Sequence, residues 1–279
     1  MKNTTILNCI DIRFPILLLA LFIATIGYSQ SKQSYFIVQY LKVHPSMENE
    51  YLQLENEVWK KMQTARIEAG VLDAWYLYRV ISPAGTKTEY NFVTILEYET
   101  AEKLSGHFES YGVDYTSLLS AEEIAFALKT PEIRDLVYEE VWRSVDLMMK
   151  DDSPDMYKFQ VFNAMSLKPG VIEDDYRELE TRYWKPMHEV RMKSNRQHGW
   201  GLFSMRIPGG TERAYHWATI DYFDRFIDIM QDEGNNNMIK IYGKKEADKI
   251  TEQTLAARDL LRSEIRELLD YVTRDSINN

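Results

Sequence analysis

The sequence predicts an α+β fold in which two tandem ferredoxin-like βαββαβ units pack sheet to sheet. Three features predict this fold: a helical segment, a strand–turn–strand segment and a closing segment each occur twice, 124 or 125 residues apart. Each half is expected to contain a strand, a helix, two strands, a second helix and a last strand or helix. That order is the ferredoxin-like one.

The repeated helix is the clearest of these features. "EYLQLENEVWKKMQTAR" (50–66) and "DYRELETRYWKPMHEVR" (175–191) share seven identical residues in seventeen aligned positions, all at an offset of 125. Two unrelated amphipathic helices share a hydrophobic spacing, but they do not share this many identities. We therefore interpret the two segments as copies of one helix.

The strand segments follow the same repeat. "WYLYRVISPAGTKTEYNFVTILEY" (75–98) aligns with "WGLFSMRIPGGTERAYHWATIDYF" (200–223) without a gap, and both are typical of a hairpin with a Pro-Gly turn. Upstream, 35–46 aligns with 159–170, and each is an apolar extended run ended by proline. These segments supply three strands of each half.

The remaining segments complete the two halves. The closing segments, 134–146 and 258–270, align with each other but fit either a strand or a helix. Helical patterns precede them in both halves. The charged, proline-bearing "KDDSPD" (150–155) marks the junction, so the two repeats are assigned to 30–150 and 151–279.

The duplication has a structural explanation. A single ferredoxin-like unit has helices on one face of its sheet, and its other face must be covered or solvated. Two units packed sheet to sheet solve this problem, as they would in a twofold dimer. The chain is therefore expected to be a monomer with an internal pseudo-twofold axis, or a dimer of such monomers.

Residues 1–29 are predicted to be a signal peptide. Lys2 and Arg13 precede the apolar "PILLLALFIATIG" (15–27), which is too short to span a bilayer, and small residues precede a cleavage site at Gln30. We expect an exported protein, periplasmic or secreted, with no stable membrane insertion after cleavage. A retained N-terminal anchor is the alternative.

The composition argues against several classes of function. The formal charge of −10 and the absence of a Lys/Arg run argue against a nucleic-acid partner. The one cysteine, Cys9, lies in the predicted signal peptide, and no two histidines have the close helical spacing of a zinc site. No metal site is expected, and no cofactor is evident because no phosphate loop or dinucleotide fingerprint occurs.

The repeated helix carries the first set of candidate residues. Its Glu, Trp, Met and Arg follow the spacing i, i+4, i+7, i+11 and so lie along one stripe. The ligand-binding candidates on this stripe are Glu55, Trp59, Arg66, Glu180, Trp184 and Arg191. In one interpretation, Arg binds an anionic group and Trp stacks on a ring in a cleft between helix and sheet. In the other, Trp is core, and Glu and Arg tie the helix to its neighbours.

Polar residues on the strands form the second set. Gln39 and Asn163 occupy equivalent positions between apolar residues, so each amide either bonds the backbone or points at a ligand. His198 and His216 lie on the two strands of one hairpin with Asp221 nearby, an arrangement that allows a His/Asp acid–base pair. Surface histidines are the alternative.

With these segments the chain resembles the dimeric α/β-barrel superfamily, which includes antibiotic-biosynthesis-monooxygenase-like and haem-degrading proteins. The resemblance covers nearly all of 35–272, twice over, and it implies an intramolecular pseudo-dimeric α/β barrel. "NAMSLKPG" (163–170) is similar to the first strand of the haem-degrading branch, where the asparagine contributes to the active site. The resemblance therefore implies a catalytic amide at Asn163, with Gln39 in its place in the first half.

The same comparison argues against haem degradation. Asp221 and Leu96 stand where that branch has a tryptophan, and its histidine ligand has no convincing match, since His107 lies in the half without the asparagine.

Two functions remain. The first is binding of a small aromatic or apolar molecule between helix and sheet.

The second is a cofactor-independent monooxygenase-like or isomerase-like enzyme with one competent pocket in the second half. It would use Asn163 together with His198 or His216 as catalytic residues.

Overall fold

The computed structural model describes residues 33–109, 113–150, 156–231 and 234–278. The predicted signal peptide lies outside these ranges. Within them, none of the helices combines the length and the apolar character that crossing a membrane requires.

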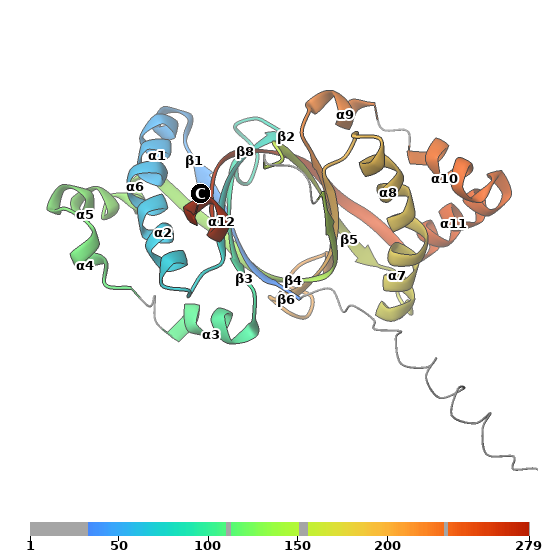
Figure 1. The fold of residues 1–279 in the computed structure, drawn as a ribbon, viewed down its shortest axis with the longest axis horizontal. Helices are drawn as coiled ribbons and strands as arrows, with labels where there is room; N and C mark the ends of the chain where they lie inside the picture. The colour runs from blue at the N-terminus through green and yellow to red at the C-terminus, as the bar shows by residue number, and fades with distance from the viewer. Residues whose placement is uncertain (1–32, 110–112, 151–155, 232–233, 279) are drawn as a thin grey trace, which may run out of the picture. The chain divides into compact units, whose positions relative to one another are not determined.

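Eight strands form one closed antiparallel barrel (Figure 1). The strands are β1 (Tyr35–Val43), β2 (Ala74–Ser82), β3 (Phe92–Tyr98), β4 (Arg134–Met149), β5 (Phe159–Leu167), β6 (Gly199–Ile207), β7 (Trp217–Phe223) and β8 (Arg258–Thr273). Their order around the barrel is β1-β3-β2-β8-β5-β7-β6-β4. Each half contributes four neighbouring strands, so the predicted pairing of two ferredoxin-like sheets is confirmed.

The two closing segments are strands, and they join the halves. The first part of β4 pairs with β1 of its own half, and the last part pairs with β6 of the other half. In the same way β8 pairs with β5 and then with β2. A helix at either place would leave the sheet edges of β2 and β6 without partners, which is why the strand alternative prevails.

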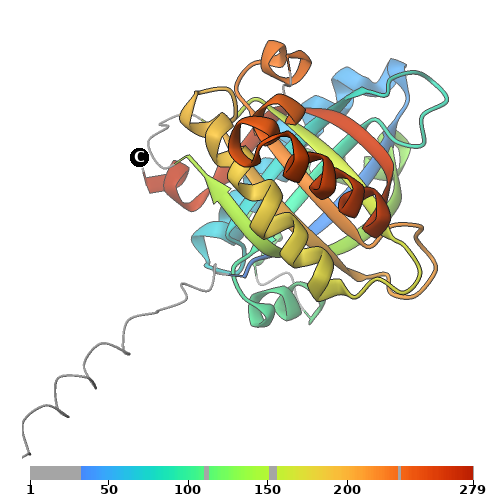
Figure 2. The same cartoon turned by 90° about the vertical axis from the view of Figure 1, so that its right-hand side faces the viewer.

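The helices lie outside the barrel, one group for each half (Figure 1). The first group is α1 (Glu48–Leu54), α2 (Lys60–Glu68), α3 (Ala101–Glu109), α4 (Tyr115–Leu118), α5 (Ala121–Ala127) and α6 (Thr130–Ile133). The second is α7 (Glu173–Leu179), α8 (Lys185–Lys193), α9 (Phe226–Met230), α10 (Gly234–Tyr242) and α11 (Lys244–Ala257). The C-terminal α12 (Arg274–Asn278) lies beside α2 of the first group (Figure 1). Figure 2 shows α7, α8 and α11 in front of the strands that they cover.

The repeated helix is interrupted by one π-helical turn in each half. These turns span Glu55–Trp59 between α1 and α2, and Glu180–Trp184 between α7 and α8. A π turn adds a residue to the local repeat. The side chains beyond it are therefore rotated relative to the straight stripe that the regular spacing predicts.

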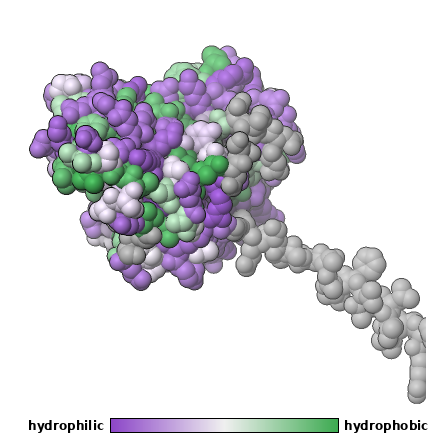
Figure 3. Space-filling model, turned by 60° about the vertical axis from the view of Figure 1, so that its left-hand side comes forward, coloured by the Kyte–Doolittle hydropathy of each residue, from purple (hydrophilic) through white to green (hydrophobic). Residues whose placement is uncertain are grey.

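Two kinds of core follow from the alternation of side chains along the strands. One kind lies between helices and sheet, where Trp75 and Trp200 occupy equivalent positions and are at most 1% exposed. The other fills part of the barrel and joins both halves through residues such as Val38 and Phe203. On the face shown in Figure 3, polar residues cover most of the surface, with smaller apolar areas between them.

Candidate functional site

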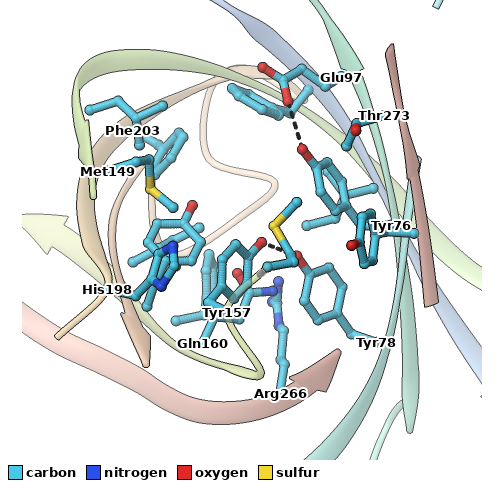
Figure 4. A pocket seen from close by; sticks show the side chains of 18 of the residues that line it. Tyr76, Tyr78, Glu97, Met149, Tyr157, Gln160, His198, Phe203, Arg266 and Thr273 are labelled. Atoms are coloured by element: carbon cyan, nitrogen blue, oxygen red, sulfur yellow. Dashed lines mark hydrogen bonds between the residues drawn. The ribbon is translucent and has the colours of Figure 1, made fainter. Parts of the chain in front are cut away.

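A cavity of about 810 Å³ lies inside the barrel. Its apolar lining comes from both halves and includes Phe36, Met149, Met156, Trp142, Phe162 and Phe203. Figure 4 shows the side chains converging on this space from several strands. We call the end lined by Lys150 and the exposed Asp275 the mouth, and the end lined by Arg266 and Trp142 the deep end.

Four tyrosines give the cavity most of its polar edge: Tyr76, Tyr78, Tyr157 and Tyr222. The hydroxyls of Tyr78 and Tyr157 hydrogen-bond each other across the two halves, and Tyr76 donates to Glu97 at 3.2 Å (Figure 4). Burial raises the pKa of all four phenols well above its usual value. They are therefore hydrogen-bond donors at neutral pH and not bases.

The deep end is closed by two buried carboxylates at equivalent positions of the repeat, Glu140 and Glu264. Tyr90 of the first half donates to Glu264 at 2.8 Å, and Tyr215 of the second half donates to Glu140 at 2.8 Å. Each hairpin therefore binds the closing strand of the other half. A buried carboxylate needs such donors because desolvation disfavours its charge.

Arg266 and Trp142 also occupy equivalent positions of the repeat, and each contacts the carboxylate of its own closing strand. The Trp142 indole donates to Glu140 at 2.9 Å, whereas the Arg266 guanidinium donates from Nε to Glu264 at 2.6 Å. Gln160, directly opposite Arg266 in the pairing of β5 and β8, lines the same end. The deep end is therefore basic on one side and aromatic on the other.

Of the three predicted catalytic residues, His198 lines the cavity. Its Nδ1 lies 2.7 Å from Asp224 Oδ1, and its ring meets that of Tyr157 edge to face. The predicted partner, Asp221, instead lies 3.2 Å from Nδ1 of His188, because Asp221 faces the helices and α8 brings His188 to it. The histidine that pairs with Asp221 is thus one that the sequence analysis did not select.

Asn163 and His216 lie apart from this cavity, so the predicted trio does not converge. Asn163 is on the helix-facing side of β5, where Ser263 donates to its side-chain oxygen at 2.8 Å and its amide donates to Asp221 at 3.3 Å. His216 Nε2 lies 2.6 Å from the Gly210 carbonyl in the hairpin loop. The hairpin places His198 and His216 at opposite ends, since His198 precedes β6 and His216 precedes β7.

Gln39 has the same kind of environment as Asn163. It faces the helices of the first half, donates to Glu139 at 2.8 Å and accepts from Thr94 at 3.0 Å. Both predicted amides are therefore held by side chains on neighbouring strands.

The predicted ligand-binding stripe lies under the helices and outside the cavity. Glu55 is 3.6 Å from Arg134, and Glu180 is 3.1 Å from Arg258, in each case on the closing strand. The Trp184 indole donates to Thr254 at 2.9 Å. These contacts tie the repeated helix to its own half, which is the second interpretation given above.

The remaining stripe residues follow the same arrangement. Trp59 is half-buried beneath the Arg134 guanidinium. Arg66 donates to Tyr98 at 3.0 Å and Arg191 stacks over Phe223, and both arginines are at most 5% exposed.

The buried Glu55 predicts an unusual pH dependence. Burial raises its pKa to about 7, and the opposing effects of Arg134 and Tyr51 only reduce this shift. The folded protein then binds more protons than the unfolded chain between about pH 4.5 and 7. The free energy of unfolding should therefore fall as pH rises through this window, by up to about 3 kcal/mol.

Comparing urea unfolding of the wild type and Glu55→Gln from pH 5 to 8 isolates this effect. The variant should gain stability relative to the wild type as pH rises. His107 acts in the opposite sense, because burial and Arg66 lower its pKa to about 4, but it contributes equally to both proteins. Parallel curves for the two proteins would rule out a titrating Glu55.

No family model matches this chain. The structure is similar to a solved structure of an anthrone oxidase-like protein, with a TM-score of 0.51 and 8% sequence identity. The similarity covers 88% of this chain and 94% of that one. This is the dimeric α/β-barrel fold. A mutant chlorite dismutase from Candidatus Nitrospira defluvii is similar to this tandem dimeric α/β barrel with a TM-score of 0.49 and 7% identity, over 88% and 93% of the two chains.

One curated relative was found by sequence. The tandem barrel is 25% identical over 153 residues to the trifunctional (S)-stylopine synthase/(S)-nandinine synthase/(S)-canadine synthase of Argemone mexicana. The match covers 54% of this chain and 27% of that protein, so the chain spans about a quarter of its length.

The histidine and the asparagine compared with the haem-degrading branch lie in different halves of the barrel. His107 lies within hydrogen-bond distance of Tyr98 and Arg66 in the first half. The asparagine of that branch corresponds to Asn163 in the second half, where Ser263 and Asp221 bind it. Each residue is therefore hydrogen-bonded within its own half.

Proposed function

We propose that this protein binds a small, largely aromatic or apolar molecule inside its barrel. The observation that carries the proposal is the 810 Å³ cavity, lined by aromatic rings and a few buried polar groups. Ligand pockets have this size and composition. A cavity of this volume between packed strands also leaves lining atoms without packing partners, a cost that a ligand would offset.

The proposal keeps the predicted ligand class but changes its place. The sequence placed the ligand between helix and sheet, where the structure has the ion pairs of Glu55 and Glu180 with the closing strands. The barrel interior offers aromatic stacking from Trp142 and Phe203 and hydrogen bonds from the Tyr78–Tyr157 pair.

Native mass spectrometry of the protein purified from its own host tests this proposal. We expect an additional small mass that is lost on denaturation, and a clean apo mass would contradict it.

We also propose that the protein is exported after removal of residues 1–29. The denatured mass reports this directly, since a chain that starts at Gln30 supports the proposal and a chain that retains residue 1 overturns it.

Filling the cavity should abolish this binding. Ala218 lies on β7, is fully buried and lines the cavity, so Ala218→Phe places a ring in the space assigned to the ligand. We expect the co-purified mass to disappear. The free energy of unfolding should fall by no more than about 3 kcal/mol, the upper end of the usual cost of overpacking.

The matched control is Ala256→Phe on the exposed surface of α11, which should retain the ligand. Equal ligand occupancy in Ala218→Phe and the wild type would place the ligand elsewhere.

A second candidate, a cofactor-independent monooxygenase-like or isomerase-like enzyme, is favoured by His198 and Asp224. A carboxylate at one ring nitrogen fixes the orientation of an imidazole that borders a cavity, as a proton acceptor requires. Incubating the wild type and His198→Gln with the co-purified molecule tests this candidate. Conversion by the wild type alone supports it, and an unchanged molecule in both incubations leaves binding as the function.

A further inference from the structure

The deep end of the cavity carries an excess of positive charge. Arg262 and Arg266 share Glu264, and Arg213 lies 3.3 Å from Glu140. Three guanidinium groups thus face two carboxylates, which leaves one net positive charge. Of these three arginines, Arg266 lines the cavity and is only 1% exposed, whereas the side chains of Arg262 and Arg213 are 25% and 21% exposed. Because the buried Arg266 shares its counter-charge with Arg262, an anion in the cavity would stabilise it.

The uncommitted polar groups beside Arg266 are hydrogen-bond donors. Gln160 is 1% exposed and lies directly opposite Arg266, and its Nε2 has no hydrogen-bond partner in the part of the chain that the structure describes. In the Tyr78–Tyr157 pair one hydroxyl donates to the other, so one phenolic hydrogen is left for a ligand. Figure 4 shows these side chains on one side of the cavity. Together they require a group with several acceptor atoms.

The negative charge in the cavity lies on its other side. Figure 4 shows Glu97 of β3 and Arg266 of β8 on opposite sides of the cavity. An anionic ligand is therefore repelled near Glu97 and attracted near Arg266, which fixes its orientation.

We propose that the ligand is an aromatic carboxylic acid, bound with its carboxylate between Arg266 and Gln160 and its ring toward Trp142 and Phe162. A planar carboxylate matches the fork of a guanidinium group and accepts from an amide at the same time. The aromatic side of the deep end supplies the stacking surface. This inference rests on the proposed function, because it needs the barrel cavity to be the binding site.

Isothermal titration calorimetry with 2-naphthoate and its neutral analogue 2-naphthamide tests the inference. The two probes have nearly the same shape and differ in charge. We expect 2-naphthoate to bind at least tenfold more tightly, which corresponds to about 1.4 kcal/mol. Equal affinities would overturn the preference for an acid while leaving cavity binding intact. Binding of neither probe, together with a clean apo mass, would contradict the proposed function itself.

Gln160→Glu provides the matched variant. It keeps the size of the side chain and places a carboxylate next to Arg266, so it should fold at least as well as the wild type. We expect the affinity for 2-naphthoate to fall at least thirtyfold and that for 2-naphthamide to stay within threefold. A thermal melt confirms folding, and a variant that still prefers 2-naphthoate would place the acid elsewhere.

Discussion

Replacing Glu264 by alanine is expected to lower the free energy of unfolding by about 3–5 kcal/mol. Glu264 is 1% exposed and accepts hydrogen bonds from Tyr90, Arg262 and Arg266. Its removal leaves the buried Arg266 without a counter-charge, and this uncompensated charge accounts for most of the loss. Urea unfolding of the two proteins at pH 7, followed by circular dichroism, measures the difference.

The control for this prediction is an exposed ion pair. Glu178 pairs with Arg182 at 2.8 Å, and both side chains are at least 60% exposed. Glu178→Ala should change stability by less than about 1 kcal/mol, since exposed pairs are weak. If the two substitutions lowered the free energy of unfolding by similar amounts, burial would not be the reason that Glu264 stabilises the protein.

Trp75→Ala and Trp200→Ala are each expected to cost about 3–5 kcal/mol, the usual range for truncating a buried tryptophan. The two residues occupy equivalent positions, but they lie in separate clusters, one beneath the helices of each half. Because β2 pairs with β8 and β4 with β6, neither half can unfold while the other keeps its barrel. Each substitution should therefore shift one shared transition.

Differential scanning calorimetry distinguishes the possibilities. A single peak that moves to lower temperature in either variant is the expected result. Two peaks, with only one of them moved by each substitution, would show that the halves unfold independently.

The repeat in the sequence carried the fold prediction. The identities around Trp59 and Trp184 established two copies of one helix, and the hairpin segments supplied the strands in the same register. What the sequence left open was the closing segment, because "RDLLRSEIRELLD" (258–270) has the composition of a helix. Pairing with β5 and β2 overrides that propensity, and such long-range pairing is not visible in a local pattern.

The candidate site was harder to predict. His198 was selected for its possible aspartate partner and lines the cavity, but the other polar residues of the cavity and those of its deep end were not selected. The sequence feature that could have indicated them is a pair of large polar residues two positions apart, which share one face of a strand. Tyr76 and Tyr78 form one such pair, and Glu264 and Arg266 form another. This feature indicates a polar barrel interior only once the closure of the barrel is known.

The equivalent positions of Trp142 and Arg266 show what joining the two copies into one chain permits. In a homodimer every mutation appears on both sides of the twofold axis, so an arginine at this position would face a second arginine across the buried centre. After duplication and fusion each copy can mutate alone. One side of the axis could become aromatic while the other became cationic, and the cavity then acquired a direction that no symmetric dimer can have.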